Sequence, residues 1–204
     1  MSPGAANLSG MTAKEQFLLA DAALRDVIDR ITPEQLDLAV PAEWSSTNVP
    51  TLRGILALHA RDEAWVPDVI AGKTIAEVGD AWDGDLLGSD PIAAYDAIND
   101  TATAAVETVT DLDATAHLSY GDYPLSVFFE HTSYYRAFQA VAIAKLIGAD
   151  FQMSEPLVDA LWQTAVPQAE QLRQWHVFGP EVAVPEGSDR QTQLLGITGF
   201  YDPS

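Results

Sequence analysis

Apolar residues recur three and four positions apart over most of the chain, which is the spacing of one face of an α-helix. Capping signals accompany this pattern: Thr12 precedes Glu15 as in a capping box, and Asp90 stands directly before Pro91. Together they predict five main helices, over about 12–31, 51–71, 91–110, 125–147 and 154–175.

These helices indicate an all-α fold, a four-helix bundle in up-down-down-up order with a fifth helix towards the C-terminus. The Gly- and Asp-rich segment 73–89 is expected to form a long crossover between the second and third helices. A short helix is expected near 189–195, and only 181–184 suggests a strand. The chain then divides into a disordered tail, the bundle and an extension packed on the bundle: 1–11, 12–176 and 177–204.

Composition narrows the classes of partner. The 204 residues suit one domain with a sizeable core, and the absence of cysteine excludes disulfides and thiolate ligands. Thirty acidic against ten basic residues give a net charge of −20, which disfavours nucleic acid and anionic membrane surfaces as partners. No apolar run approaches the ~20 residues of a spanning helix, and the first residues lack a signal-peptide pattern. We expect a cytoplasmic protein, a monomer or homodimer, that binds a small molecule.

Polar groups interrupt the apolar faces of two predicted helices. With His131 as the zero of angle on helix 125–147, Tyr135 falls at about 40° and Gln139 at about 80°. His59 and Glu63 lie one turn apart within the apolar face of helix 51–71. Four-helix bundles build ligand sites from such inward side chains. The predicted pocket holds these five residues, with aromatic walls from Phe128, Phe138, Tyr134 and Trp162.

A structural role is the alternative for each of these residues. One buried His or Tyr is usually a hydrogen-bonded core residue. Five polar groups on two helices favour a functional cavity, because each buried polar group needs a partner.

Several segments resemble one family. They include TPEQLDLAVPAEW (32–44), LALHARDEAW in the second helix, YGDYP before the fourth, and FGPEVAVPEGSDRQTQLLGITG near the end. Together they resemble the actinobacterial branch of the DinB-like superfamily, related to mycothiol-dependent maleylpyruvate isomerases. The resemblance covers about 11–203 and implies the same helical bundle.

The resemblance also implies a divalent metal, held by a His on the second helix and an acid-x-x-x-His pair on the fourth. His59 matches the first ligand, but the acid falls on Tyr135 and the second His on Gln139. A neutral phenol and an amide are poor ligands for Zn or Ni. We therefore expect no metal or other cofactor; a shifted site of His59, Glu63 and His131 is the alternative.

Three functions follow as hypotheses. The first is an enzyme without the metal triad that performs acid/base or template chemistry (isomerisation, cyclisation or elimination) on a largely apolar substrate. His131 or Glu63 would be the acid or base, Tyr135 a hydrogen-bond donor, and His59 an orienting group. The second is the role that the resemblance implies, metal-dependent transfer of mycothiol or isomerisation with it. The third is a non-catalytic small-molecule-binding or stress protein.

Overall fold

The computed structural model describes residues 10–44 and 49–203, and it confirms the all-α class. Four long helices form its centre: α1 (Ala13–Ile28), α2 (Leu52–Ile70), α4 (Pro91–Glu107) and α5 (Leu125–Ile147). The shorter helices are α3 (Ile75–Val78), α6 (Glu155–Ala165), α7 (Ala169–Gln174) and α8 (Arg190–Thr198). The 3-10 turns are η1 (Pro33–Asp37), η2 (Ala42–Trp44) and η3 (Val166–Gln168), and the strands are β1 (Thr115–Leu118) and β2 (Gly121–Pro124).

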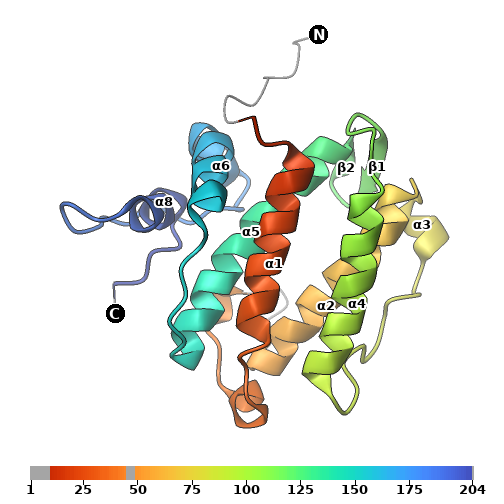
Figure 1. The fold of residues 1–204 in the computed structure, drawn as a ribbon, viewed down its shortest axis with the longest axis horizontal. Coiled ribbons are helices and arrows are strands. Elements are labelled where there is room, and N and C mark those ends of the chain that lie inside the picture. The colour runs from red at the N-terminus through yellow and green to blue at the C-terminus, as the bar shows by residue number, and fades with distance from the viewer. Residues whose placement is uncertain (1–9, 45–48, 204) are drawn as a thin grey trace.

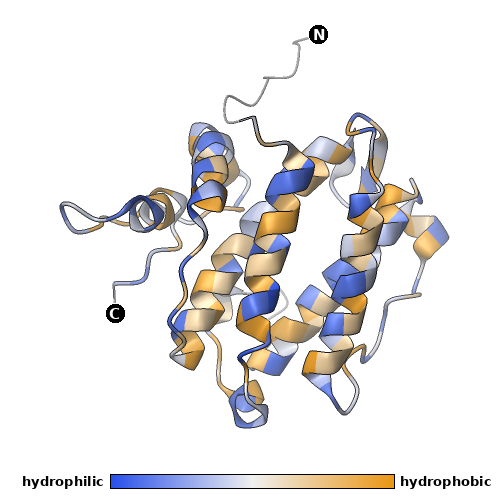
Figure 2. Cartoon of the chain, viewed as in Figure 1, coloured by the Kyte–Doolittle hydropathy of each residue, from blue (hydrophilic) through white to orange (hydrophobic). Residues whose placement is uncertain are grey.

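The long helices pack in two pairs. α1 lies along α5 and α2 along α4, and α1 also contacts α4. In Figure 1 the chain descends α1, rises through α2, returns along the segment that contains α3, rises again through α4 and descends α5. α6 packs against α1 and α5, and α8 lies on the far side of α6, where it contacts α6 and η3. Figure 2 shows hydrophobic and hydrophilic residues on each long helix, as amphipathic packing requires.

Local sequence signals account for the helix ends. Thr12 and Glu15 form the expected capping box at α1, and Asp90 caps α4 through the amide of Ala93. α5 begins and ends at the predicted residues, and Gly148 after it has a φ of 69°, the left-handed conformation that glycine tolerates best.

The structure differs from the prediction at three places. The connector between α4 and α5 is a β-hairpin, with Ala116 opposite Tyr123, whereas 181–184 is not a strand. The hairpin strands are four residues each, too short to display a clear alternation. The predicted helix 154–175 is also interrupted by η3, because Pro167 cannot donate a backbone hydrogen bond.

None of the helices in the described residues combines the length and apolar character needed to cross a membrane.

Candidate functional site

One buried polar layer joins all four long helices. Its members are Asp21 on α1, Glu63 on α2, Asn99 on α4 and Arg136 on α5, each no more than 2% exposed. The layer separates two apolar clusters. On α1, for example, Phe17 belongs to one cluster and Leu24 to the other. Such a layer at the centre of a bundle is costly unless its members satisfy one another.

Asp21 is the most completely bonded member of the layer. Asn99 Nδ2 lies 3.0 Å from each of its carboxylate oxygens. Thr103 Oγ1 donates to Oδ2 at 3.0 Å, and Arg136 Nε donates to Oδ1 at 3.2 Å. Donors from two neighbouring helices thus hold this carboxylate in one position.

Arg136 connects Asp21 to Glu63. Its Nε and Nη2 both lie 2.8 Å from Glu63 Oε1, and its guanidinium stands 4.5 Å from the centre of the Phe17 ring. Glu63 Oε2 has no hydrogen-bond partner among the described residues. One oxygen of Glu63 is therefore held by Arg136, while the other is buried without a hydrogen-bond partner among the described residues.

Burial changes the acidity of Glu63. Removal from water raises the pKa of its carboxyl to about 8; Arg136 opposes the rise and Asp21 adds to it. The carboxyl of Glu63 therefore binds a proton more readily than the carboxyl of an exposed glutamate does. This is the ionisation behaviour of a general acid or base.

His59 and Tyr135 form the neighbouring part of the site. Their rings stack with centroids 4.6 Å apart, joining α2 to α5. Burial, aided by the charge of Arg136, lowers the pKa of His59 to about 3, so its imidazole is neutral. Burial raises the pKa of Tyr135, which remains a phenol. Gln139 lies one helical turn after Tyr135. Neither His59 Nε2 nor Gln139 Oε1 has a hydrogen-bond partner among the described residues, and both atoms are buried.

His131 lies in a different environment. Its Nδ1 is 3.2 Å from the Tyr120 hydroxyl, and its ring neighbours are Tyr120, Tyr123 and Tyr134. It is half-buried, and burial lowers the pKa of its imidazole. The structure thus brings His59 and Tyr135 into contact and places Glu63 against Arg136, but it directs His131 towards the hairpin.

The four aromatic residues predicted to line the pocket make contacts in different parts of the molecule. Phe128 packs against Phe129 in the cluster above the polar layer. Tyr134 and Phe138 contact Phe178 near the C-terminus. Trp162 on α6 lies beneath the guanidinium of Arg190, 5.0 Å away. Of the five residues predicted to bind substrate, Gln139 presents an unpartnered polar atom.

The residues do not fit the metal that the resemblance implies. Among the described residues, no three His, Asp or Glu side chains are grouped so that they could hold a metal ion. Glu63 faces the cation of Arg136, which would repel a divalent ion, and Tyr135 is a neutral phenol. His131, the third donor of the alternative site, contacts Tyr120 instead.

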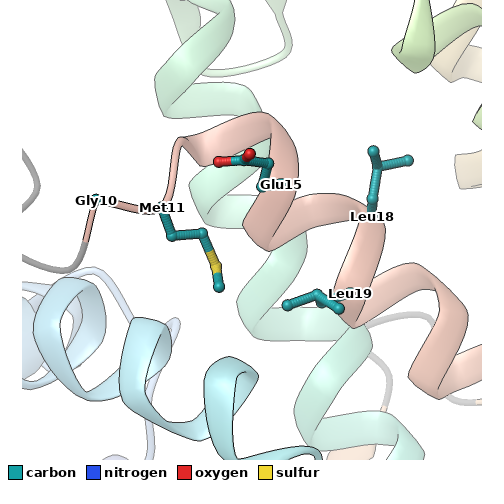
Figure 3. Close-up of a pocket in the computed structure, with 5 residues that line it drawn as sticks. All are labelled: Gly10, Met11, Glu15, Leu18 and Leu19. Atoms are coloured by element: carbon teal, nitrogen blue, oxygen red, sulfur yellow. The ribbon is translucent and has the colours of Figure 1, made fainter.

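Two surface hollows lie elsewhere. One, of about 530 Å³, opens at the start of α1, where Met11, Leu18 and Leu19 surround it together with Gly10 and Glu15 (Figure 3). The other, of about 320 Å³, is lined by residues of α6, α8 and the segments before them, including Met153, Val158 and Arg190. Neither is lined by a predicted site residue.

No family model matches this chain, and no match was found among curated proteins or solved structures.

Proposed function

We propose that the protein is a small-molecule enzyme that uses Glu63 as a proton donor and acceptor at the junction of α2 and α5. The observation that carries the proposal is the environment of this carboxyl. It is fully buried, its Oε1 is bonded to Arg136, and its Oε2 has no hydrogen-bond partner among the described residues. Burial raises its pKa to about 8. A purely structural carboxylate would be expected to have both oxygens bonded.

The neighbouring groups suit proton transfer to and from a largely apolar substrate. Tyr135, as a phenol, can donate a hydrogen bond to an oxygen on which negative charge develops. His59 is neutral and can orient a substrate through Nε2. Arg136 holds the carboxyl of Glu63 in place. The chemistry we propose is isomerisation, cyclisation or elimination, each of which begins with removal or addition of one proton.

The proposed fold is the DinB-like bundle. The order of the long helices, the long crossover through α3 and the added helices α6 to α8 support this assignment. We propose further that this member works without the metal triad, because Tyr135 and Gln139 replace two ligands and Arg136 lies beside Glu63. Metal-dependent transfer of mycothiol is therefore the less favoured function.

Hydrogen–deuterium exchange into small ketones tests the proposal without knowledge of the natural substrate. Phenylacetone and phenylpyruvate, one uncharged and one anionic, are incubated with the protein in D₂O, and loss of the α-proton signal is followed by NMR. We expect catalysed exchange in at least one of them, and a loss of about 100-fold or more in Glu63→Gln, the usual effect of removing a general base.

Glu107→Gln is the matched control, because Glu107 is exposed at the end of α4. It should exchange protons at the wild-type rate. Exchange that Glu63→Gln leaves intact would overturn the assignment of Glu63. No exchange in either ketone would overturn the enzymatic proposal and favour a non-catalytic binding protein.

A further inference from the structure

The basic residues of this protein are already committed to partners. All ten lie in the described part of the chain. Every arginine and lysine except Lys14 forms an ion pair with an acidic side chain, and Lys14 Nζ donates to the backbone carbonyls of Glu107 and Val109. An anionic ligand would have to compete with one of these ion pairs, or with the carbonyl groups that Lys14 contacts, to obtain a counter-charge.

The same is true at the proposed site. Arg136 is its one cation, and it contacts both Asp21 and Glu63. The three groups sum to zero if Glu63 is protonated and to −1 if it is ionised. In neither state does the layer offer a net positive charge to a carboxylate or a phosphate. Since His59 is buried and neutral, it adds none.

Cationic ligands are opposed for a different reason. An ammonium or amidinium near Glu63 would also lie near the guanidinium of Arg136, 2.8 Å from the same carboxyl. The aromatic ring of Tyr135 could attract a cation, but one of its two faces is already covered by the ring of His59, with centroids 4.6 Å apart. Transfer of a cation from water into this site is thus unfavourable, because the carboxyl of Glu63 already pairs with Arg136 and cannot fully compensate a second positive charge.

The unpartnered atoms indicate what the site can recognise. Glu63 Oε2, His59 Nε2 and Gln139 Oε1 belong to side chains that are at most 3% exposed. These atoms belong to a carboxyl group, an imidazole ring and a side-chain amide, respectively. Such groups can form hydrogen bonds with the donors and acceptors of an uncharged ligand. Tyr135 is only partly buried, so the site meets the surface at an aromatic ring.

We infer that the site at the α2–α5 junction selects uncharged, hydrogen-bonding molecules, and that Asp21 enforces this selection by neutralising Arg136. The inference rests on the proposed function for its location and names the class of substrate. Asp21 acts through Arg136 and is therefore a specificity-determining residue that does not itself touch the ligand.

Three probes of nearly the same shape test the inference: benzamide, benzoate and benzamidine are uncharged, anionic and cationic at neutral pH. Each is titrated into the labelled protein while the side-chain amide signals of Gln139 are followed by NMR. We expect benzamide to shift these signals, and both charged probes to bind at least about tenfold more weakly, because a buried charge lacks a counter-ion.

Asp21→Asn gives the decisive comparison, since it leaves Arg136 with one carboxyl partner in place of two. Benzoate should then bind the variant at least about tenfold more tightly than it binds the wild type. Asp100→Asn is the matched control, because Asp100 is exposed and pairs with Arg25. It should keep the wild-type order of the three probes.

Several results would overturn the inference. They are tighter binding of benzoate or benzamidine than of benzamide by the wild type, no response of Gln139 to any probe, or an unchanged benzoate affinity in folded Asp21→Asn. If Asp21→Asn does not fold, the wild-type order alone decides. Binding of benzamide without proton exchange in the ketones would leave the inference standing while the proposed enzymatic activity fails.

Discussion

Arg136 is the largest fully buried side chain among the described residues, and it holds the polar layer together. Its guanidinium contacts carboxyl groups from α1 and α2 and the ring of Phe17. A buried cation that contacts two carboxyl groups is stable only as part of that group, because removal of one member leaves a buried charge or polar atom without its partner in a medium of low dielectric constant.

Arg136→Met should therefore destabilise the protein by about 3–5 kcal/mol, since it leaves the buried Asp21 without its counter-charge and Glu63 Oε1 without its hydrogen-bond donor. The measurement is the free energy of unfolding from urea titration. Arg61→Met is the control: Arg61 pairs with Asp83 at the surface, where such a pair is worth about 0–1 kcal/mol. A loss below about 1 kcal/mol in Arg136→Met would contradict the central role of this side chain.

The sequence predicts the polar residues of α2 better than those of α5. On α2 one apolar stripe contains His59 and Glu63, and both are buried as a stripe predicts. α5 is buried on several sides by α1, α6 and the hairpin, so a single stripe centred on His131 misses Arg136, about 140° away. α5 carries apolar residues on several sides, and an arginine in such a helix is the signal that could have revealed the burial of Arg136.

In the C-terminal third of the chain, one proline and one glycine determine where a helix breaks and how closely another helix packs. Pro167 divides the predicted helix 154–175, and helical periodicity does not register the break because the apolar positions continue on both sides. α8 docks at Gly196, where an added Cβ would stand 2.6 Å from Val184 Cγ1 and 2.8 Å from the carbonyl oxygen of Val182. The extension thus packs through a residue without a side chain.

Gly196→Ala should accordingly loosen the C-terminal extension, at a cost of about 1–3 kcal/mol, because the backbone of Val182 must move. Amide hydrogen exchange should become faster over 178–203 while α1 and α5 keep their protection. Glu186→Ala, at an exposed position of the same extension, should leave the exchange pattern unchanged. Slow exchange throughout the extension in Gly196→Ala would show that the close contact is not required.

At the scale of the whole molecule, the excess of acids has a structural consequence. Almost every basic side chain is paired with an acid. The charge that remains uncompensated on the described residues is therefore almost entirely negative. Composition alone predicts the exclusion of nucleic acid. It does not predict that Asp21 and Glu63 share Arg136, since that depends on which faces of four separate helices meet.

The pH titration of the Glu63 carboxyl is the most direct test of its proposed role in proton transfer. In protein labelled with ¹³C-glutamate, and with Glu63→Gln to assign the signal, the side-chain carboxyl carbon is followed against pH. The pKa is raised from the ordinary 4.5 to about 8, so the native state keeps a proton that the unfolded chain releases. The stability that this group contributes is then lost as pH rises through that interval. We predict a midpoint near 8 and a protonated carboxyl at neutral pH. A midpoint near 4.5 would contradict the proposal that Glu63 is the proton donor and acceptor of the site.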